Sequence, residues 1–350
     1  VKVVEMQSEA GAIGLVHGAL QADSLATTFT ASQGLLLMIP SLYKVAGEML
    51  PLVIHVAARS ISTHALSIFG DHQDIYATRM SGVCMLCSNN PVEAYHLANV
   101  AHLAAIKSSL PFIHFFDGFR TSHEINKIRL INNDKIKELI DKKSLNDFRA
   151  KAINPERPNT RGTAQNEDTY FQCMEVRNKF YEEAILDVCY YMDKVNKICK
   201  TNYKPFNYYG ADNPDTIIIA MGSVCDTIHE TVSYLNDKYN KKYGVISVHL
   251  YRPFSNKHLF SKIPNSVKNI VVLDRSKEAG SNGEALYLDV CSALKDMNVN
   301  IYGGRYGLSS KNTTPAHIKA IFDYVEEGKI HNNFTIGIND DVTNLSLNFD

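Results

Sequence analysis

The sequence predicts an α/β protein built from two open, parallel β-sheets. Short runs of apolar and β-branched residues alternate with helical stretches along most of the chain, which is the pattern of parallel βαβ units. The 350 residues are enough for about two domains. A polar and charged stretch from about residue 134 to 203 separates two such alternating regions. We therefore expect one sheet on each side of this stretch.

The first alternating region supplies the elements of the first sheet. Helices are expected at 8–22, 35–50 and 91–107, and the third begins with Pro91, which a helix tolerates at its first position because the N–H there has no helical partner. The run 52–58, LVIHVAA, is apolar almost throughout, which is typical of a strand covered on both faces. Strands are expected at 1–4, 25–30, 52–58, 83–86 and 111–116.

The middle of the chain and the second alternating region follow. Residues 153–166 are rich in turn formers and are expected to be a loop, and 205–214 is expected to be a linker. Strands are expected at 216–220, 243–251, 269–273 and 299–302. Helices are expected near 135–141, 174–200, 256–261, 283–295 and 314–327, with another after Ser223 up to about 238. This pattern divides the chain into residues 1–204 and 205–330, and leaves 331–350 as a tail or the start of a further domain.

Composition and charge exclude several classes of protein. Lys and Arg total 36 against 37 for Asp and Glu, so the chain lacks the basic excess of a nucleic-acid binder or a polybasic membrane-surface protein. No run of about 18 apolar residues is present to form a membrane span. The seven cysteines are odd in number and scattered, which indicates a reducing, intracellular compartment. The chain opens at Val1 in a strand-like run, so we expect it to be part of a longer protein.

Glu9 is the first candidate for a chemical role. It lies where the first expected strand gives way to a helix, and ligands of open parallel sheets bind at the carboxyl ends of the strands. The competing interpretation is a first-turn carboxylate that interacts favourably with the helix dipole, an effect worth about 0.3–1 kcal/mol. Position alone favours this second interpretation.

Arg59 is the second candidate. It follows the expected strand 52–58 at the same edge of the sheet, where a guanidinium could hold a carboxylate by two parallel hydrogen bonds. The alternative is an arginine paired with a nearby acid at the sheet edge. Position alone slightly favours the alternative.

Metal sites have weak signals in this sequence. The run 70–74, GDHQD, mixes side chains that can bind metals, but its spacing matches no strong metal motif, and Asp71 is expected to cap a helix. Cys84 and Cys87 form a CxxC in an expected strand, where side chains three apart point to opposite faces. No second CxxC exists, so we expect no metal ligand in this chain.

Three further polar or glycine-rich runs are interpreted as turns. The run 117–124, DGFRTSHE, follows an expected strand and is rich in hydrogen-bonding groups. The runs 280–283 and 303–307 are glycine-rich and could approach a phosphate, but neither fits a nucleotide-binding motif.

Nine longer runs resemble the pyruvate:ferredoxin oxidoreductase family. They are spread from the first residue to about residue 326, and several are long and unusual. The runs are VKVVEMQSEAGAIG (1–14), TTFTASQGLLLMIP (27–40), HVAARS (55–60), THALSIFGDHQD (63–74), FFDGFRTSHE (115–124), RGTAQN (161–166), LYRPFS (250–255), VLDRSKE (272–278) and GGRYGLSSK (303–311). The resemblance extends to the related pyruvate:NADP oxidoreductases, in which a similar core is fused to a flavin reductase.

The resemblance implies an activity and a set of cofactors. The family oxidatively decarboxylates pyruvate with thiamine diphosphate and coenzyme A, giving acetyl-CoA and CO₂, and passes the electrons through [4Fe-4S] clusters to ferredoxin, or to NADP in the fused form. It also implies that residues 1–204 form a pyrimidine-type thiamine diphosphate-binding domain and that 205–330 form a transketolase C-terminal-like domain.

The resemblance also implies what these residues do not supply. The family's N-terminal segment with a substrate-contacting threonine is absent from this sequence. The domain that binds the diphosphate and Mg²⁺, the cysteine-rich cluster domain and the coenzyme A domain are absent as well. We therefore expect Mg²⁺ and the clusters to be bound by other domains of the same enzyme, and the chain alone to be inactive.

Two residues carry over from the family to this sequence. Glu9 falls on the glutamate that hydrogen-bonds the aminopyrimidine of thiamine, and Arg59 falls on the arginine that binds the pyruvate carboxylate. A carboxylate bonded to the pyrimidine favours its imino form, whose nitrogen can take the C2 proton of thiamine. Such a charge-assisted bond is strong in a dry site.

Three interpretations of the function stay open. The first is a segment of an enzyme that acts on pyruvate and coenzyme A, with ferredoxin or a fused NADP reductase as electron acceptor. We expect this enzyme to be a homodimer. The second is a non-catalytic α/β interaction module, and the third is another 2-oxoacid oxidoreductase. For the enzyme we expect a cytoplasmic location, with a mitochondrion-related organelle, the hydrogenosome, as the alternative.

Overall fold

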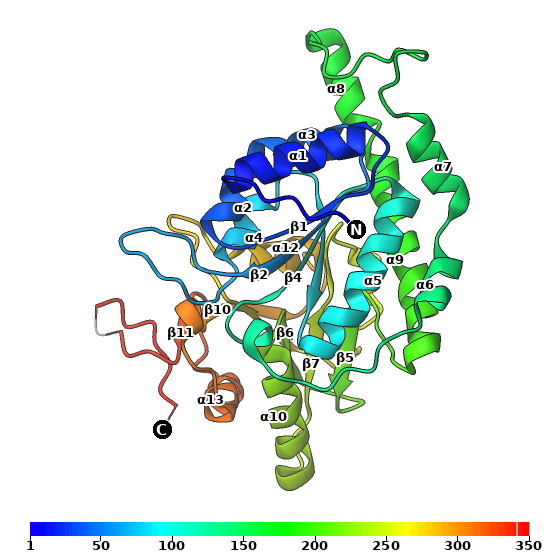
Figure 1. Cartoon of the computed structure of the whole chain (residues 1–350). Helices are drawn as coiled ribbons and strands as arrows, with labels where there is room; N and C mark the ends of the chain where they lie inside the picture. Colours follow the sequence, from blue (N-terminus) through cyan, green and yellow to red (C-terminus); the bar gives the residue numbers. More distant parts are fainter. Residues whose placement is uncertain (341, 350) are drawn as a thin grey trace.

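A computed structural model describes residues 1–340 and 342–349 of the chain, and it contains two mostly parallel β-sheets with helices on both faces of each (Figure 1). The α/β class with two open sheets is therefore confirmed. Two positions in the tail, 341 and 350, lie outside the described residues.

The first sheet has the strand order β1-β2-β4-β3-β8. Its strands are β1 (Thr27–Thr30), β2 (Val53–Ala58), β3 (Cys84–Ser88), β4 (Phe112–Asp117) and β8 (Leu250–Arg252). The first four run parallel, and β8 pairs with β3 in the antiparallel direction at one edge. Side chains alternate between the two faces, so Ile54 and Val56 join one core cluster while Val53 joins the other.

Helices of the first half cover both faces of this sheet. Helices α5 (Pro91–Ser108) and α9 (Asn178–Cys199) share a core cluster with one face. The other face packs against α1 to α4, which are α1 (Glu9–Gln21), α2 (Gln33–Leu37), α3 (Ile39–Gly47) and α4 (Gln73–Thr78). The polar middle of the chain forms α6 (Asn133–Leu139), α7 (Lys142–Ala150) and α8 (Glu167–Glu175).

Local sequence explains where the two most regular of these helices begin. Ser8 caps α1, because its Oγ accepts a hydrogen bond from the Gly11 N–H at 3.3 Å. Asn90 caps α5 in the same way by accepting from the Glu93 N–H at 3.0 Å. Pro91 follows at the first helical position, as predicted.

The second sheet has the strand order β11-β10-β9-β6-β7-β5. Its strands are β5 (Phe206–Gly210), β6 (Thr216–Ala220), β7 (Tyr243–Val248), β9 (Asn269–Asp274), β10 (Asn300–Tyr306) and β11 (Phe334–Ile336). All are parallel except β5, which pairs with β7 in the antiparallel direction. Helices α10 (Val224–Tyr239) and α13 (Pro315–Glu326) cover one face, and α11 (Asn256–Phe260) and α12 (Ala285–Ala293) cover the other.

One hydrophobic cluster continues from the first sheet into the second. Its buried members include Phe115 of β4, Tyr76 of α4, Tyr251 of β8 and Ile219 of β6. The two halves are therefore joined by a common apolar core. In the part of the chain that the structure describes, no helix has the length and apolarity needed to cross a membrane.

The structure corrects two predicted strands. Residues 1–4 are not a strand; they have no regular structure, are exposed, and pair with none of the strands in the described part of the chain. The expected strand 243–251 is two strands, and the chain passes at His249 from β7 in the second sheet to β8 in the first. Because of this crossing, β8 forms backbone hydrogen bonds with the edge strand β3. The alternation of apolar and polar residues along 243–251 does not predict this pairing.

Other corrections concern segments without a clear period. The expected linker 205–214 contains the edge strand β5, and the unassigned tail contributes β11 to the second sheet. The expected helix 35–50 is divided at Met38 into α2 and α3, because Pro40 cannot continue a helix from the preceding turn. The cap of α4 is His72 rather than Asp71, although Asp71 Oδ1 does accept a bond from the Gln73 N–H at 3.0 Å. The division near residue 204 stays a prediction.

Candidate active site

The candidate site lies at the carboxyl ends of β1, β2 and β4, which are neighbours in the first sheet. The connections that leave these three strands contain residues 31–32, 59–72 and 118–124. Ligands of open parallel sheets bind at this edge because the loops there converge from adjacent strands. Both predicted residues, Glu9 and Arg59, are adjacent to these connections.

Glu9 is the first residue of α1, and its side chain lies against the start of α2. A Cβ atom added to Gly34 would be 2.7 Å from Glu9 Cγ and 2.8 Å from Glu9 Oε1. The same added atom would be 2.7 Å from Thr30 Oγ1, a buried oxygen that has no hydrogen-bond partner in the structure. Glycine at position 34 therefore leaves the space that the Glu9 carboxylate occupies beside Thr30.

Arg59 follows β2 and is held from two sides. Its backbone N–H donates to Asp74 Oδ2 at 3.0 Å, and its side-chain Nε donates to the carbonyl of Ile68 at 2.6 Å. Its guanidinium lies over the Phe119 ring, 5.1 Å from the centroid. Within residues 1–340 and 342–349 its two terminal nitrogens make no hydrogen bond and no ion pair, so the alternative of a structural ion pair is not supported. The free side of the guanidinium can bind a carboxylate with two parallel bonds.

Asp74 connects the turn next to Glu9 with the backbone of Arg59. Its Oδ2 accepts from the Ser32 N–H at 2.7 Å and from the Arg59 N–H at 3.0 Å, and its Oδ1 accepts from the Ile75 N–H at 2.8 Å. Burial raises the pKa of Asp74 to about 7, although these three N–H groups favour the charged form. Its charge is therefore fully developed only above neutral pH.

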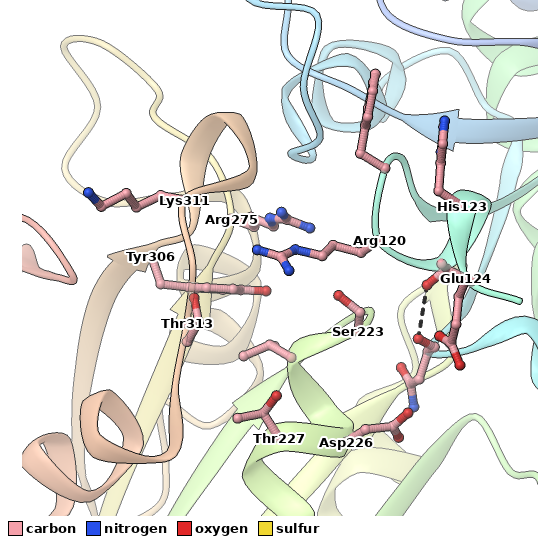
Figure 2. Close-up of a pocket in the computed structure, with 14 residues that line it drawn as sticks. Arg120, His123, Glu124, Ser223, Asp226, Thr227, Arg275, Tyr306, Lys311 and Thr313 are labelled. Atoms are coloured by element: carbon pink, nitrogen blue, oxygen red, sulfur yellow. Dashed lines mark hydrogen bonds between the residues drawn. The ribbon is translucent and has the colours of Figure 1, made fainter.

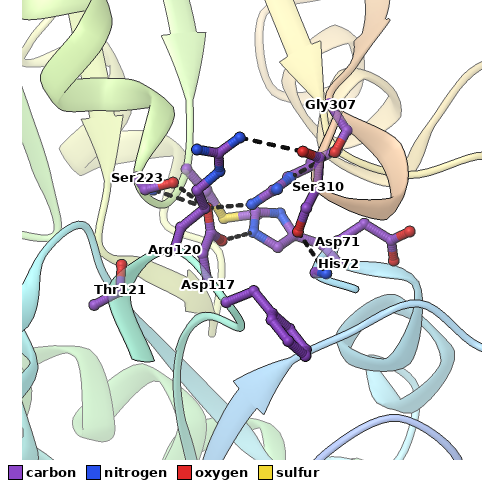
Figure 3. A network of polar contacts seen from close by, with 12 residues as sticks. Asp71, His72, Asp117, Arg120, Thr121, Ser223, Gly307 and Ser310 are labelled. Carbon is purple, nitrogen blue, oxygen red and sulfur yellow. Dashed lines mark hydrogen bonds and ion pairs between the residues drawn. The ribbon is translucent and has the colours of Figure 1, made fainter. Parts of the chain in front are cut away.

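Two further residues of the run 70–74 join the two halves of the molecule. Asp71 Oδ2 accepts from Ser60 Oγ at 2.6 Å and from the Ser309 N–H at 3.3 Å. The His72 backbone N–H donates to the carbonyl of Arg275 at 2.8 Å in the second half, and His72 Nε2 bonds to Asp117 Oδ1 at 2.5 Å within the first half (Figure 3). The run is thus a buried connector between the first sheet and the loops of the second.

Asp117, at the end of β4, is the centre of this connection. Its Oδ2 pairs with Arg275 Nη1 at 2.6 Å and accepts from the Ser223 N–H at 3.1 Å (Figure 3). Burial would raise the pKa of the Asp117 carboxyl, but the charges of Arg275 and His72 outweigh it and hold that pKa well below its usual range. The ion pair is buried, and its members also bond to His72, Ser223 and the carbonyl of Gly307, so it connects the end of β4 with the loops of the second sheet.

A pocket of about 430 Å³ opens between the two sheets beside this ion pair (Figure 2). The run 117–124 supplies one wall through Arg120, which donates to the carbonyl of Ser310 at 3.1 Å. Ser223 and Arg275 line the opposite wall. The run is therefore more than a turn, because it closes contacts between the two halves of the chain.

Three histidines, one each from β2, β4 and the covering helix α5, were not singled out by the sequence. His55 Nδ1 lies 3.0 Å from His114 Nδ1, and His55 Nε2 lies 3.1 Å from His102 Nε2. Burial lowers the pKa of His55 to about 4, so these imidazoles are neutral at physiological pH. A signal was present, since HVAA and HFFD place a histidine in equivalent positions of the paired strands β2 and β4.

The CxxC pair and the glycines of the run 303–307 lie in packed parts of the structure. Cys84 and Cys87 are buried in different core clusters, as their spacing in a strand predicts. Gly303 and Gly304 lie against the rings of Tyr287 and Phe334, so they make room for aromatic packing and not for a phosphate. The described residues contain no cluster of three or more His, Cys, Asp or Glu side chains that could hold a metal ion.

The fold defines a two-sheet α/β protein, and its candidate ligand site lies at the carboxyl ends of parallel strands. Residues 1–191 match the family model described as pyruvate flavodoxin/ferredoxin oxidoreductase, thiamine diphosphate-binding, and residues 214–318 match that of pyruvate:ferredoxin oxidoreductase core domain II. The chain belongs to the pyruvate flavodoxin/ferredoxin oxidoreductase family, and the resemblance seen in the sequence is confirmed.

Individual relatives agree with this assignment. The chain is 55% identical over 349 residues to a pyruvate-flavodoxin oxidoreductase of Enterobacter agglomerans, and 52% identical over 349 residues to pyruvate:ferredoxin oxidoreductase of Moorella thermoacetica. Each alignment covers 99% of this chain and 30% of the relative, so the chain spans about a third of their length.

A solved structure shares the fold. It is 2-oxoglutarate:ferredoxin oxidoreductase from Magnetococcus marinus with 2-oxoglutarate, coenzyme A and succinyl-CoA bound. The match has a TM-score of 0.61 and 16% sequence identity, and covers 94% of this chain and 57% of that one.

Proposed function

We propose that this chain is the segment of a pyruvate oxidoreductase that holds the aminopyrimidine of thiamine diphosphate through Glu9 and the pyruvate carboxylate through Arg59. The observation that supports the proposal most is the arrangement of Glu9 against Thr30 and Gly34, connected by Asp74 to Arg59. Among the described residues, the terminal nitrogens of Arg59 have no hydrogen-bond partner, and of its guanidinium only Nε is bonded, to the Ile68 carbonyl.

The residues fit a bound thiamine ring. The hydroxyl of Thr30 is buried and unpartnered, and Gly34 leaves room for the Glu9 carboxylate next to it. Thiamine diphosphate would supply the electron sink for decarboxylation. Glu9 would accept a hydrogen bond from the ring and thereby favour its imino form, whose nitrogen is free to act as base, and Arg59 would orient the carboxylate that is lost as CO₂.

The complete reaction needs more than these residues. We propose that the whole enzyme converts pyruvate and coenzyme A to acetyl-CoA and CO₂, with Mg²⁺ and [4Fe-4S] clusters bound by other domains. The acceptor would be ferredoxin, flavodoxin or a fused NADP reductase, and the enzyme would be a homodimer. The first two acceptors are named in the relatives' descriptions.

The test uses the full-length protein that contains this chain. Reduction of a viologen dye that depends on pyruvate and coenzyme A is measured for the wild type, for Glu9→Gln and for Glu5→Gln, an exposed carboxylate four residues before it. Loss of a positioned acid–base group lowers turnover about 10²- to 10⁴-fold, so Glu9→Gln should fall in that range and Glu5→Gln should match the wild type.

Two results would contradict the proposal. Near wild-type turnover in Glu9→Gln would return Glu9 to a helix-terminal role. Activity with 2-oxoglutarate and not with pyruvate would change the substrate to another 2-oxoacid.

A further inference from the structure

We infer that Asp74 is a positioning residue that holds the Glu9 side of the site and Arg59 in one fixed arrangement. This inference rests on the proposed function. The role belongs to a side chain that touches neither cofactor nor substrate and acts only through the backbone of its neighbours.

Asp74 is hydrogen-bonded inside the protein through both of its carboxylate oxygens. Its carboxylate is 0% exposed, and it accepts three backbone N–H groups and no side-chain donor. The donors come from the end of β1, the end of β2 and the first turn of α4. One carboxylate therefore ties together the ends of two neighbouring strands at the edge where the site lies.

The turn that Asp74 holds has a strained backbone at Ser32. Ser32 has φ 53° and ψ −130°, which is unfavourable for a residue with a side chain. Its N–H donates to Asp74, and its Oγ donates to the carbonyl of Ser60 next to Arg59. Without an acceptor for the Ser32 N–H, this turn would relax toward an ordinary conformation.

The turn at Ser32 also supports the Glu9 side chain. Ser32 lies between Thr30 and Gly34, the two residues against which the Glu9 side chain packs. A relaxation at Ser32 therefore moves the surface that positions the Glu9 carboxylate. On the other side, Asp74 Oδ2 holds the Arg59 N–H, so the same relaxation shifts the start of the arginine side chain.

A matched control exists in the second half of the chain. Asp274 is also buried, at 1% exposed, and accepts the Leu286 and Tyr287 N–H groups and the Tyr76 hydroxyl. It belongs to the second sheet, and neither Ser32 nor Arg59 is among its three hydrogen-bond donors. An Asp→Asn change at either position replaces one acceptor oxygen by a donor in a buried three-bond site.

The experiment compares Asp74→Asn and Asp274→Asn in the full-length protein at pH 8, where the Asp74 charge is developed. Displacing a positioned group by a fraction of an ångström typically costs about 10- to 100-fold in affinity or activity. We expect Asp74→Asn to raise both the thiamine diphosphate Kd and the pyruvate KM by about this factor. Asp274→Asn should lower the melting temperature about as much as Asp74→Asn does, because both remove a buried acceptor, while leaving both constants at their wild-type values.

A second measurement does not depend on activity. Amide hydrogen exchange is followed by mass spectrometry in peptides that cover 30–34 and 58–60 of the cofactor-free protein. Asp74→Asn should accelerate exchange in both peptides together, and Asp274→Asn in neither.

The outcomes separate the two proposals. An active wild type whose Asp74→Asn form keeps both constants would overturn the positioning role, as would unchanged exchange in either peptide. A wild type without pyruvate activity would overturn the proposed function, and the exchange measurement would still decide whether Asp74 holds the two strand ends together.

Discussion

Replacing Gly34 by alanine tests the placement of Glu9 without changing any charged group. A Cβ at position 34 would lie 2.7 Å from Glu9 Cγ, and ordinary contact begins at 3.4 Å, so the Glu9 side chain must move by roughly 0.7 Å. A hydrogen bond of about 2.8 Å stretched by that distance reaches 3.5 Å, where it is no longer effective. Loss of a bond to a charged group costs about 1.5–3 kcal/mol, which corresponds to about 10- to 150-fold.

The assay is isothermal titration of the full-length protein with thiamine diphosphate, followed by pyruvate-dependent dye reduction. The control is Gly14→Ala in α1, where an added Cβ meets nothing within 4 Å. This control should raise the free energy of unfolding by about 0.5–1 kcal/mol, because alanine favours a helix over glycine, and should leave thiamine affinity unchanged.

A double mutant isolates the mechanism. If alanine acts by displacing the carboxylate, Gly34→Ala should add little to the effect of Glu9→Gln, since the two changes remove the same bond. Wild-type thiamine affinity in Gly34→Ala, or full additivity with Glu9→Gln, would refute the reasoning.

Two further predictions concern the ends of β2 and β4. Arg59→Ala should lower kcat/KM for pyruvate by the equivalent of about 2–4 kcal/mol of transition-state stabilisation, and Arg59→Lys should lower it by less, because lysine keeps the charge but not the planar fork. Both variants should keep the affinity for thiamine diphosphate. Loss of thiamine binding with an unchanged pyruvate KM would make Arg59 a cofactor residue. Asp117→Asn should destabilise the protein by about 3–5 kcal/mol at pH 7, because it leaves Arg275 buried without its partner. The folded-state pKa of Asp117 is lowered, so its stabilising effect is fully present above the unfolded pKa near 3.8 and is lost progressively as pH falls from there toward the lower folded-state pKa. Urea unfolding from about pH 5 down to about pH 2 should therefore show a steeper loss of stability for the wild type than for the variant.

The sequence by itself determined the class of the fold and the two residues proposed for the chemistry. Alternation of apolar strands and helices depends on local side-chain periods, so most strands and helices could be placed from it. Arg59 could be placed at the end of β2 because a residue that follows a parallel strand must lie at its carboxyl end. The strand expected before Glu9 does not form, and Glu9 reaches this edge through its packing against Thr30 and Gly34. The roles assigned to Glu9 and Arg59 came from the resemblance to the family and not from these periods.

Tertiary structure alone decided how the two halves are joined. The crossing of β8 into the first sheet involves three residues, which are too few to carry a period, and its partner β3 lies about 165 positions earlier in the chain. Asp71, His72 and Asp74 have the composition of a surface turn, and only their burial among N–H donors and an opposite carboxylate shows that they are connectors. A polar side chain looks the same in a sequence whether it faces water or a buried partner, because the energy that distinguishes the two comes from contacts between residues far apart in the chain.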